Sequence, residues 1–286
     1  MATLIYVGES LVYRTVGLMD AALGEVDKSA ADAARQTLKA IEEYAVECSI
    51  IKVWGSEMID YIVDETVQIY GGYGFVEEYP AERAYRDARI NRIFEGTNEI
   101  NRLIITGFLL KRAMSGQLPL MPAIKKLMDE VLSGPSVGEE LEGALADEQK
   151  LVAQAKKLGL FAAGAATQKY MQAIQDQQEI MGAIADMTIE AYAMETAVLR
   201  AQKIVAAKGE SAAELPIAMT RVYLAHAMEK IESAARKVIA AVADGDMLRT
   251  QLAILRRLAK YEPFNTVELG QQIAQKMIER GKFTLA

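Results

Sequence analysis

The stretch "QIYGGYGFVEEYPAERAYRDARINRIFEGTNEINR", residues 68–102, is the most irregular part of this sequence and decides how the rest is interpreted. Gly71 and Gly72 end a long helical pattern, as glycines commonly do. They do not form a dinucleotide-binding fingerprint, because a helix rather than a strand precedes them. Pro80 follows shortly and is suited to the first turn of a short helix.

The end of this stretch places Glu95 directly before a helix that we expect to begin at Thr97 or Asn98. Glu99 then lies in the first turn, where the helix dipole favours an anion. A carboxylate here has two interpretations, a solvated surface turn or a catalytic base. The apolar neighbour Phe94 would raise the pKa of Glu95 and the helix terminus would lower it, and spacing alone favours the turn.

The composition of the whole chain favours an all-α fold. Hydrophobic residues make up 51% of the 286 residues, and the six prolines leave long runs of strong helix formers. No segment shows sustained period-two alternation. The formal net charge of −7 argues against a nucleic-acid partner. A single cysteine and a single histidine argue against a thiolate or histidine-rich metal site.

The pattern along the chain predicts two helical domains. We expect a first helical bundle over residues 1–118, a linker over 119–140, and a second helical domain over 141–286 with four or five helices. Within the first bundle, one long helix is expected over about 29–69, with Cys48 and Trp54 on its buried apolar stripe.

The first residues, "MATLIYVGESLVYR", enter helical periodicity at once and lack a basic leader. We therefore expect that the chain begins inside a longer helix and that sequence upstream is missing. No run of residues approaches the ~18 apolar residues that a membrane span requires. These features indicate a cytoplasmic protein.

The run from Gln68 to Arg102 closely resembles the signature near the C-terminus of the acyl-CoA dehydrogenases. The shared pattern is Q-I-x-G-G-x-G-F-x-x-E-Y-P-x-E-R-x-x-R-D-A-R-I-x-x-I-x-E-G-T. Residues 1–70 are similar to the C-terminal helical bundle of that family. The region after residue 120 resembles the extra helical domain of its very-long-chain branch.

This resemblance implies an FAD enzyme of fatty-acid β-oxidation that converts an acyl-CoA into the 2,3-enoyl-CoA. Glu95 would be the base that removes the α-proton, and Gly96 would lie against the substrate. Two groups of residues would contact FAD. The first group would contact the FAD of a neighbouring subunit and comprises Gln68, Ile69, Tyr70, Gly71 and Gly72. The second group would contact the FAD of its own subunit and comprises Thr97, Asn98 and Glu99. A shared site implies a homodimer or larger oligomer, and the family's electron acceptor is an electron-transfer flavoprotein.

The chain departs from the family in one respect, since the N-terminal helical domain and central β-domain are absent. We therefore expect the isolated chain to bind FAD poorly and not to turn over. Two alternatives stay open: a non-catalytic helical scaffold or oligomerisation module, and an acyl-CoA oxidase. The role of the second helical domain, including any membrane contact, is also open.

Overall fold

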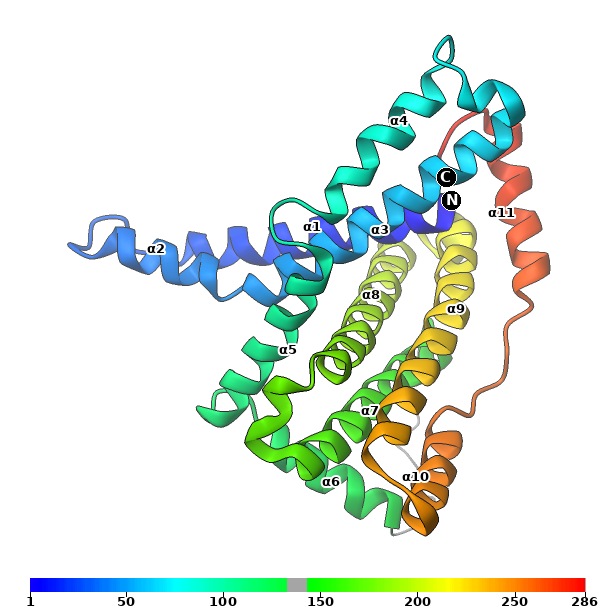
Figure 1. The fold of residues 1–286 in the computed structure, drawn as a ribbon. Helices are drawn as coiled ribbons and strands as arrows, with labels where there is room; N and C mark the ends of the chain where they lie inside the picture. Colours follow the sequence, from blue (N-terminus) through cyan, green and yellow to red (C-terminus); the bar gives the residue numbers. More distant parts are fainter. Residues whose placement is uncertain (133–142, 286) are drawn as a thin grey trace. The chain divides into compact units, whose positions relative to one another are not determined.

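The computed structural model describes residues 1–132 and 143–285, and every regular element in these ranges is helical, which confirms the expected fold class (Figure 1). The chain divides into two compact units. The first comprises Met1 and Thr3–Ile105, and the second comprises Ala2 and Thr106–Ala286. The boundary falls within one continuous helix, α5 (Asn98–Met114).

The first unit is organised around one long helix, α3. Its elements before α5 are α1 (Ala2–Gly24), α2 (Ala33–Glu42), α3 (Ala45–Tyr70), η1 (Gly71–Phe75), α4 (Pro80–Arg89) and η2 (Ile90–Arg92). Helix α3 packs against α4, η1 and η2. Trp54 of α3 is buried against Gly8 of α1, where an added Cβ would come within 3.0 Å of the indole ring. Glycine at that position therefore leaves room for the indole ring.

The predicted single helix over 29–69 is wrong, because the chain breaks between α2 and α3. At the break, the N–H of Tyr44 bonds to the carbonyl of Ile41, a tighter i→i+3 bond than an α-helix makes. Helix α2 buries none of its residues, so packing does not hold the two segments in one line. Cys48, predicted to be in the core, is exposed.

The other local predictions of helix ends in this unit are confirmed. Helix α3 stops at Gly71, whose φ of 60° suits a glycine after a helix. Pro80 occupies the first turn of α4. Helix α5 begins at Asn98.

The second unit is built around three long helices that pack on one another, α7, α8 and α9 (Figure 1). Its elements after α5 are α6 (Leu120–Leu132), α7 (Ala146–Tyr170), η3 (Met171–Asp176), α8 (Gln178–Lys208), α9 (Glu210–Val242), α10 (Gly245–Leu258) and α11 (Thr266–Arg280). Large side chains that are fully buried come from all three central helices and include Leu158, Met194 and Ile231. The interior of this unit is therefore a continuous apolar core.

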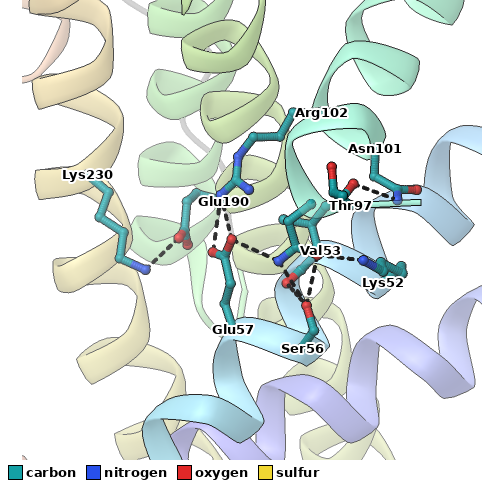
Figure 2. A network of polar contacts seen from close by, with 10 residues as sticks. Lys52, Val53, Ser56, Glu57, Thr97, Asn101, Arg102, Glu190 and Lys230 are labelled. Carbon is teal, nitrogen blue, oxygen red and sulfur yellow. Dashed lines mark hydrogen bonds and ion pairs between the residues drawn. The ribbon is translucent and has the colours of Figure 1, made fainter. Parts of the chain in front are cut away.

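Two buried carboxylates inside the second unit are paired. The buried carboxylate of Glu190 accepts a hydrogen bond from the Tyr223 hydroxyl at 2.6 Å. It accepts another from Lys230 Nζ at 2.6 Å, which Figure 2 shows. Glu148, which is also buried, accepts from Arg221 Nε at 2.6 Å. These pairs meet the requirement that a buried charge have a partner.

The region predicted as a linker contains a helix. Residues 120–132 form α6, which packs on α7, while 133–140 lie outside the described residues. The predicted domain limits at 118 and 141 stay a prediction. In the parts of the chain that the structure describes, no helix is both long enough and apolar enough to cross a bilayer.

Candidate active-site loop

Glu95 lies in an exposed turn between η2 and α5, which we call the Glu95 loop (residues 93–97). Its φ is 55°, in the left-handed region, and Gly96 follows with a φ of 76°. A left-handed conformation at a residue other than glycine costs about 1–3 kcal/mol and persists only where neighbouring contacts impose it. Ile93 and Phe94, just before it, are each 49% exposed. The turn therefore presents a carboxylate beside apolar surface.

Asn101 of α5 binds the backbone of this loop from inside. Its Nδ2 donates to the carbonyl oxygens of Gly96 at 2.8 Å and Thr97 at 3.1 Å, with a longer contact of 3.4 Å to Glu95 O. The side chain is nearly buried, with 6% exposure. An added Cβ at Gly96 would lie 3.0 Å from Asn101 Nδ2, so the tight turn requires glycine by both space and φ.

Lys52 of α3 also binds this loop. Its Nζ donates to Gly96 O at 2.6 Å and to Asn98 Oδ1 at 2.7 Å. Burial lowers the pKa of Lys52, and the nearby carboxylates of Glu99, Glu57 and Glu95 act in the opposite direction. The carbonyl of Gly96 thus accepts hydrogen bonds from two side chains that belong to different helices.

Asn98 completes the connection between the loop and α3. Its amide is 2% exposed and donates to Ser56 Oγ at 2.9 Å and Glu57 Oε1 at 3.1 Å. Glu57 in turn pairs with Arg102 at 2.8 Å. The first turn of α5 is therefore joined to α3 by a network of hydrogen bonds and an ion pair.

The other two residues predicted at the start of α5 are accessible. Thr97 caps the helix, because its hydroxyl accepts from the N–H of Ile100 at 3.3 Å. Glu99 is exposed. A hydrogen bond from its own backbone N–H and another from the Thr97 hydroxyl lower the pKa of the Glu99 carboxyl.

The second predicted group, residues 68–72, lies at the far end of α3. All five residues are exposed, and Ile69 is 71% exposed. An added Cβ at Gly71 or Gly72 would meet nothing within 4 Å, so the backbone there is open to an approaching group. Gln68 stands 16 residues after Lys52 on α3, which is roughly 24 Å at the α-helical rise. Within one chain, the structure does not bring this group to the Glu95 loop.

Sequence reasoning missed the residues that hold the loop: Lys52, Ser56, Glu57, Asn101 and Arg102. One signal was available in α3. Polar residues recur at 52, 56 and 60 of α3, and an i, i+4 spacing places them on one face. Asp60 on that face pairs with Arg92 of η2 at 3.0 Å, which anchors the segment before Glu95 as well.

Comparison with known proteins gives matches along the chain. Two family models, both described as the acyl-CoA dehydrogenase C-terminal domain, match residues 1–110 and 154–257. A probable acyl-CoA dehydrogenase of Bacillus subtilis is 46% identical over 285 residues, which cover 100% of this chain and 48% of the relative. The very long-chain specific acyl-CoA dehydrogenase of Rattus norvegicus mitochondria is 31% identical over 71% of this chain and 31% of its own length.

A solved structure agrees with these relatives. The crystal structure of an acyl-CoA dehydrogenase complexed with FAD from Bacillus anthracis superposes with a TM-score of 0.95 at 45% identity, over 99% of this chain and 48% of that one. The chain thus spans about half the length of the Bacillus proteins that it matches. Together with the signature around Glu95, these matches show that the chain belongs to the acyl-CoA dehydrogenase family and corresponds to its C-terminal helical portion.

Proposed function

We propose that the protein to which this chain contributes is an FAD-dependent acyl-CoA dehydrogenase, with Glu95 as the catalytic base. The observation that carries the proposal is the conformation of Glu95. A glutamate is held at a left-handed φ, on the surface, by contacts from two helices. Strain of this kind concentrates at functional sites, and a solvated turn would not need it.

The proposed reaction removes two hydrogens from an acyl-CoA and leaves the 2,3-enoyl-CoA. The Glu95 carboxylate takes the α-proton, and the electron pair of that C–H bond forms the new carbon–carbon double bond. FAD, when bound, supplies the acceptor for the hydride that leaves the β-carbon. In this proposal the N–H of Glu95 would polarise the thioester carbonyl, and Gly96 would offer a surface without a side chain against which the substrate would lie.

The residues proposed to hold FAD fit that role, with one exception. Thr97 and Glu99 are accessible at the start of α5, where a helix N-terminus offers N–H groups to an anionic ligand. Residues 68–72 present an open backbone that suits a large, flat ligand from a neighbouring subunit. The side chain of Asn98 is buried and hydrogen-bonded to Ser56 of α3, which argues against the expected direct contact with FAD. We assign it instead to support of Thr97 and Glu99.

The proposed assembly is at least a homodimer, because the two FAD-binding groups are far apart within one chain. Exposed aromatic residues around η1 support it. Tyr73 is 66% exposed and Phe75 is 79% exposed, and the ring of Tyr79 contacts the rings of Tyr70 and Tyr73. Such a patch is typical of an interaction surface. As electron acceptor we propose an electron-transfer flavoprotein.

The test is an assay of enoyl-CoA formation by the full-length protein, with acyl-CoA substrates of several chain lengths and an artificial electron acceptor. Glu95→Gln removes the base while it keeps the size of the side chain. It should lower turnover by about 10² to 10⁴-fold. The matched control is Glu25→Gln, the same chemical change at the exposed residue that ends α1, and it should leave turnover unchanged.

Two outcomes would contradict the proposal. Near-normal turnover by Glu95→Gln would show that another group is the base. A full-length protein that holds FAD and forms no enoyl-CoA from any acyl-CoA would support the non-catalytic scaffold. An acyl-CoA oxidase would be recognised by hydrogen peroxide formed in step with the enoyl-CoA in air.

A further inference from the structure

We propose that Lys52 and Asn101 are positioning residues of this reaction, which hold the Glu95 carboxylate in place through the backbone carbonyls beside it. The inference rests on the proposed function, because it takes Glu95 as the base. It adds a role for two side chains that do not touch the substrate. It also gives the reason why the loop keeps a conformation that a glutamate would not adopt by itself.

The Glu95 loop has little support of its own. Two consecutive residues, Glu95 and Gly96, have positive φ, so the turn lies outside the regular hydrogen-bond pattern of η2 and α5. Glu95 is exposed, and the two residues before it are each 49% exposed. Little side-chain packing therefore fixes the carboxylate, and its position depends on what holds the backbone.

The backbone of the loop is held at its carbonyl oxygens. Gly96 O accepts from Lys52 Nζ at 2.6 Å and from Asn101 Nδ2 at 2.8 Å. Asn101 reaches the carbonyls on either side as well, at 3.1 Å for Thr97 and 3.4 Å for Glu95. A carbonyl oxygen with two lone pairs can accept both donors, and a charged donor makes the stronger bond. The peptide planes around Glu95 are fixed by these contacts.

Both donors belong to residues that are fixed by their surroundings. Lys52 projects from α3 next to Val53 and Trp54, which are buried at 0% and 6% exposure. Its ammonium also bonds to Asn98 Oδ1, and Asn98 is itself held by Ser56 and Glu57. Asn101 is nearly buried in the first turns of α5. Because both donors are fixed, the loop cannot rotate without losing bonds to two helices.

The test measures removal of the α-proton separately from transfer of the hydride. An acyl-CoA analogue with oxygen or sulfur in place of the β-CH₂ keeps its α-protons and has no hydride to give. The full-length holoenzyme in D₂O should exchange the α-protons of this analogue for deuterium, and NMR follows the rate. Stopped-flow bleaching of the flavin by an ordinary acyl-CoA, without oxygen, gives the rate of the complete step.

Lys52→Met keeps an unbranched side chain that is one heavy atom shorter, and it removes all the N–H donors. It should slow both α-proton exchange and flavin bleaching by about 10 to 100-fold, the size of effect that a misplaced catalytic group produces. FAD content and the Kd of the analogue should stay within about twofold, because the Lys52 ammonium is engaged with Gly96 O and Asn98 Oδ1. Lys52→Arg, which keeps charge and donors, should recover part of the rate. Lys39→Met at an exposed position of α2 controls for the lost charge and should match the unmodified enzyme.

The possible failures are distinguishable. Exchange at the normal rate in Lys52→Met, while Glu95→Gln abolishes it, would overturn the positioning role and leave the proposed function intact. Normal exchange in Glu95→Gln would overturn the proposed function itself. If Lys52→Met does not form a holoenzyme, Asn101→Ser tests the same contacts without altering α3. Normal exchange in that variant would overturn the inference.

Discussion

The two units of this chain differ in how far they bury their large apolar side chains. In the second unit, large apolar side chains from α7, α8 and α9 are buried in one core. The first unit has fewer residues, yet most of the exposed large hydrophobic side chains of the described chain lie in it, around η1, η2 and along α1. Its loop is instead held by polar contacts among Lys52, Asn98 and Asn101.

This difference suggests that the second unit mainly provides stability and that the first unit mainly provides function. The second unit encloses its own apolar surface, as a domain that is stable by itself must. The first unit carries the family signature and leaves apolar surface open, which is the property of a surface completed by other groups. We infer that substitutions in the second unit act mainly on folding, and that substitutions in the first act mainly on assembly and catalysis.

The largest effect on stability is expected from the core of the second unit. Ile231 of α9 is fully buried, and Ile231→Ala should lower the free energy of unfolding by about 2–5 kcal/mol through lost burial and the cavity left behind. Ile278→Ala is the matched control, because Ile278 of α11 is 74% exposed. Urea denaturation of both variants measures the difference. If both variants lost the same free energy of unfolding, the proposed difference between buried and exposed positions would be wrong.

A smaller effect is expected where the backbone of the first unit packs most tightly. An added Cβ at Gly74 would lie 2.4 Å from the carbonyl oxygen of Val67, so η1 must shift away from α3. Gly74→Ala should therefore cost about 1–3 kcal/mol by overpacking. At Gly72, two residues earlier, an added Cβ would meet nothing within 4 Å. Gly72→Ala should therefore change the free energy of unfolding by less than about 0.5 kcal/mol. A tolerant Gly74 would mean that η1 is looser than the structure shows.

The smallest effect on stability, and a clear effect on assembly, is expected at Phe75. This side chain is 79% exposed, so Phe75→Ser should change the free energy of unfolding by less than about 0.5 kcal/mol. In the full-length protein the same change should weaken the dimer, which sedimentation over a dilution series can detect. Val267→Ser, at a 70% exposed residue of the second unit, should leave the dimer unchanged. If Phe75→Ser left the dissociation of the dimer unchanged, the interface would have to lie elsewhere.

The sequence was informative where the signals are local. Gly71 and Pro80 fixed the end of α3 and the start of α4, and the start of α5 at Asn98 was also foreseen. These predictions succeeded because each depends on the backbone preference of one or two residues. The family signature added the interpretation of Glu95, which spacing alone had assigned to a surface turn.

The features that sequence reasoning missed depend on contacts between distant residues. Lys52 meets Gly96 across 44 positions, and the spacing of polar residues on α3 does not say which loop they face. The break between α2 and α3 has no glycine or proline to mark it. The left-handed φ of Glu95 was unforeseeable for another reason, since glutamate has no preference for that region.

The φ of 55° at Glu95 also bears on how this protein responds to selection. Asparagine and glycine adopt that backbone conformation more easily than glutamate does. A library at position 95 that is sorted for thermal stability alone would favour these two residues and discard the carboxylate. Selection for thermal stability and selection for catalysis thus favour different residues at position 95. A consensus or stability-guided redesign must therefore keep glutamate there.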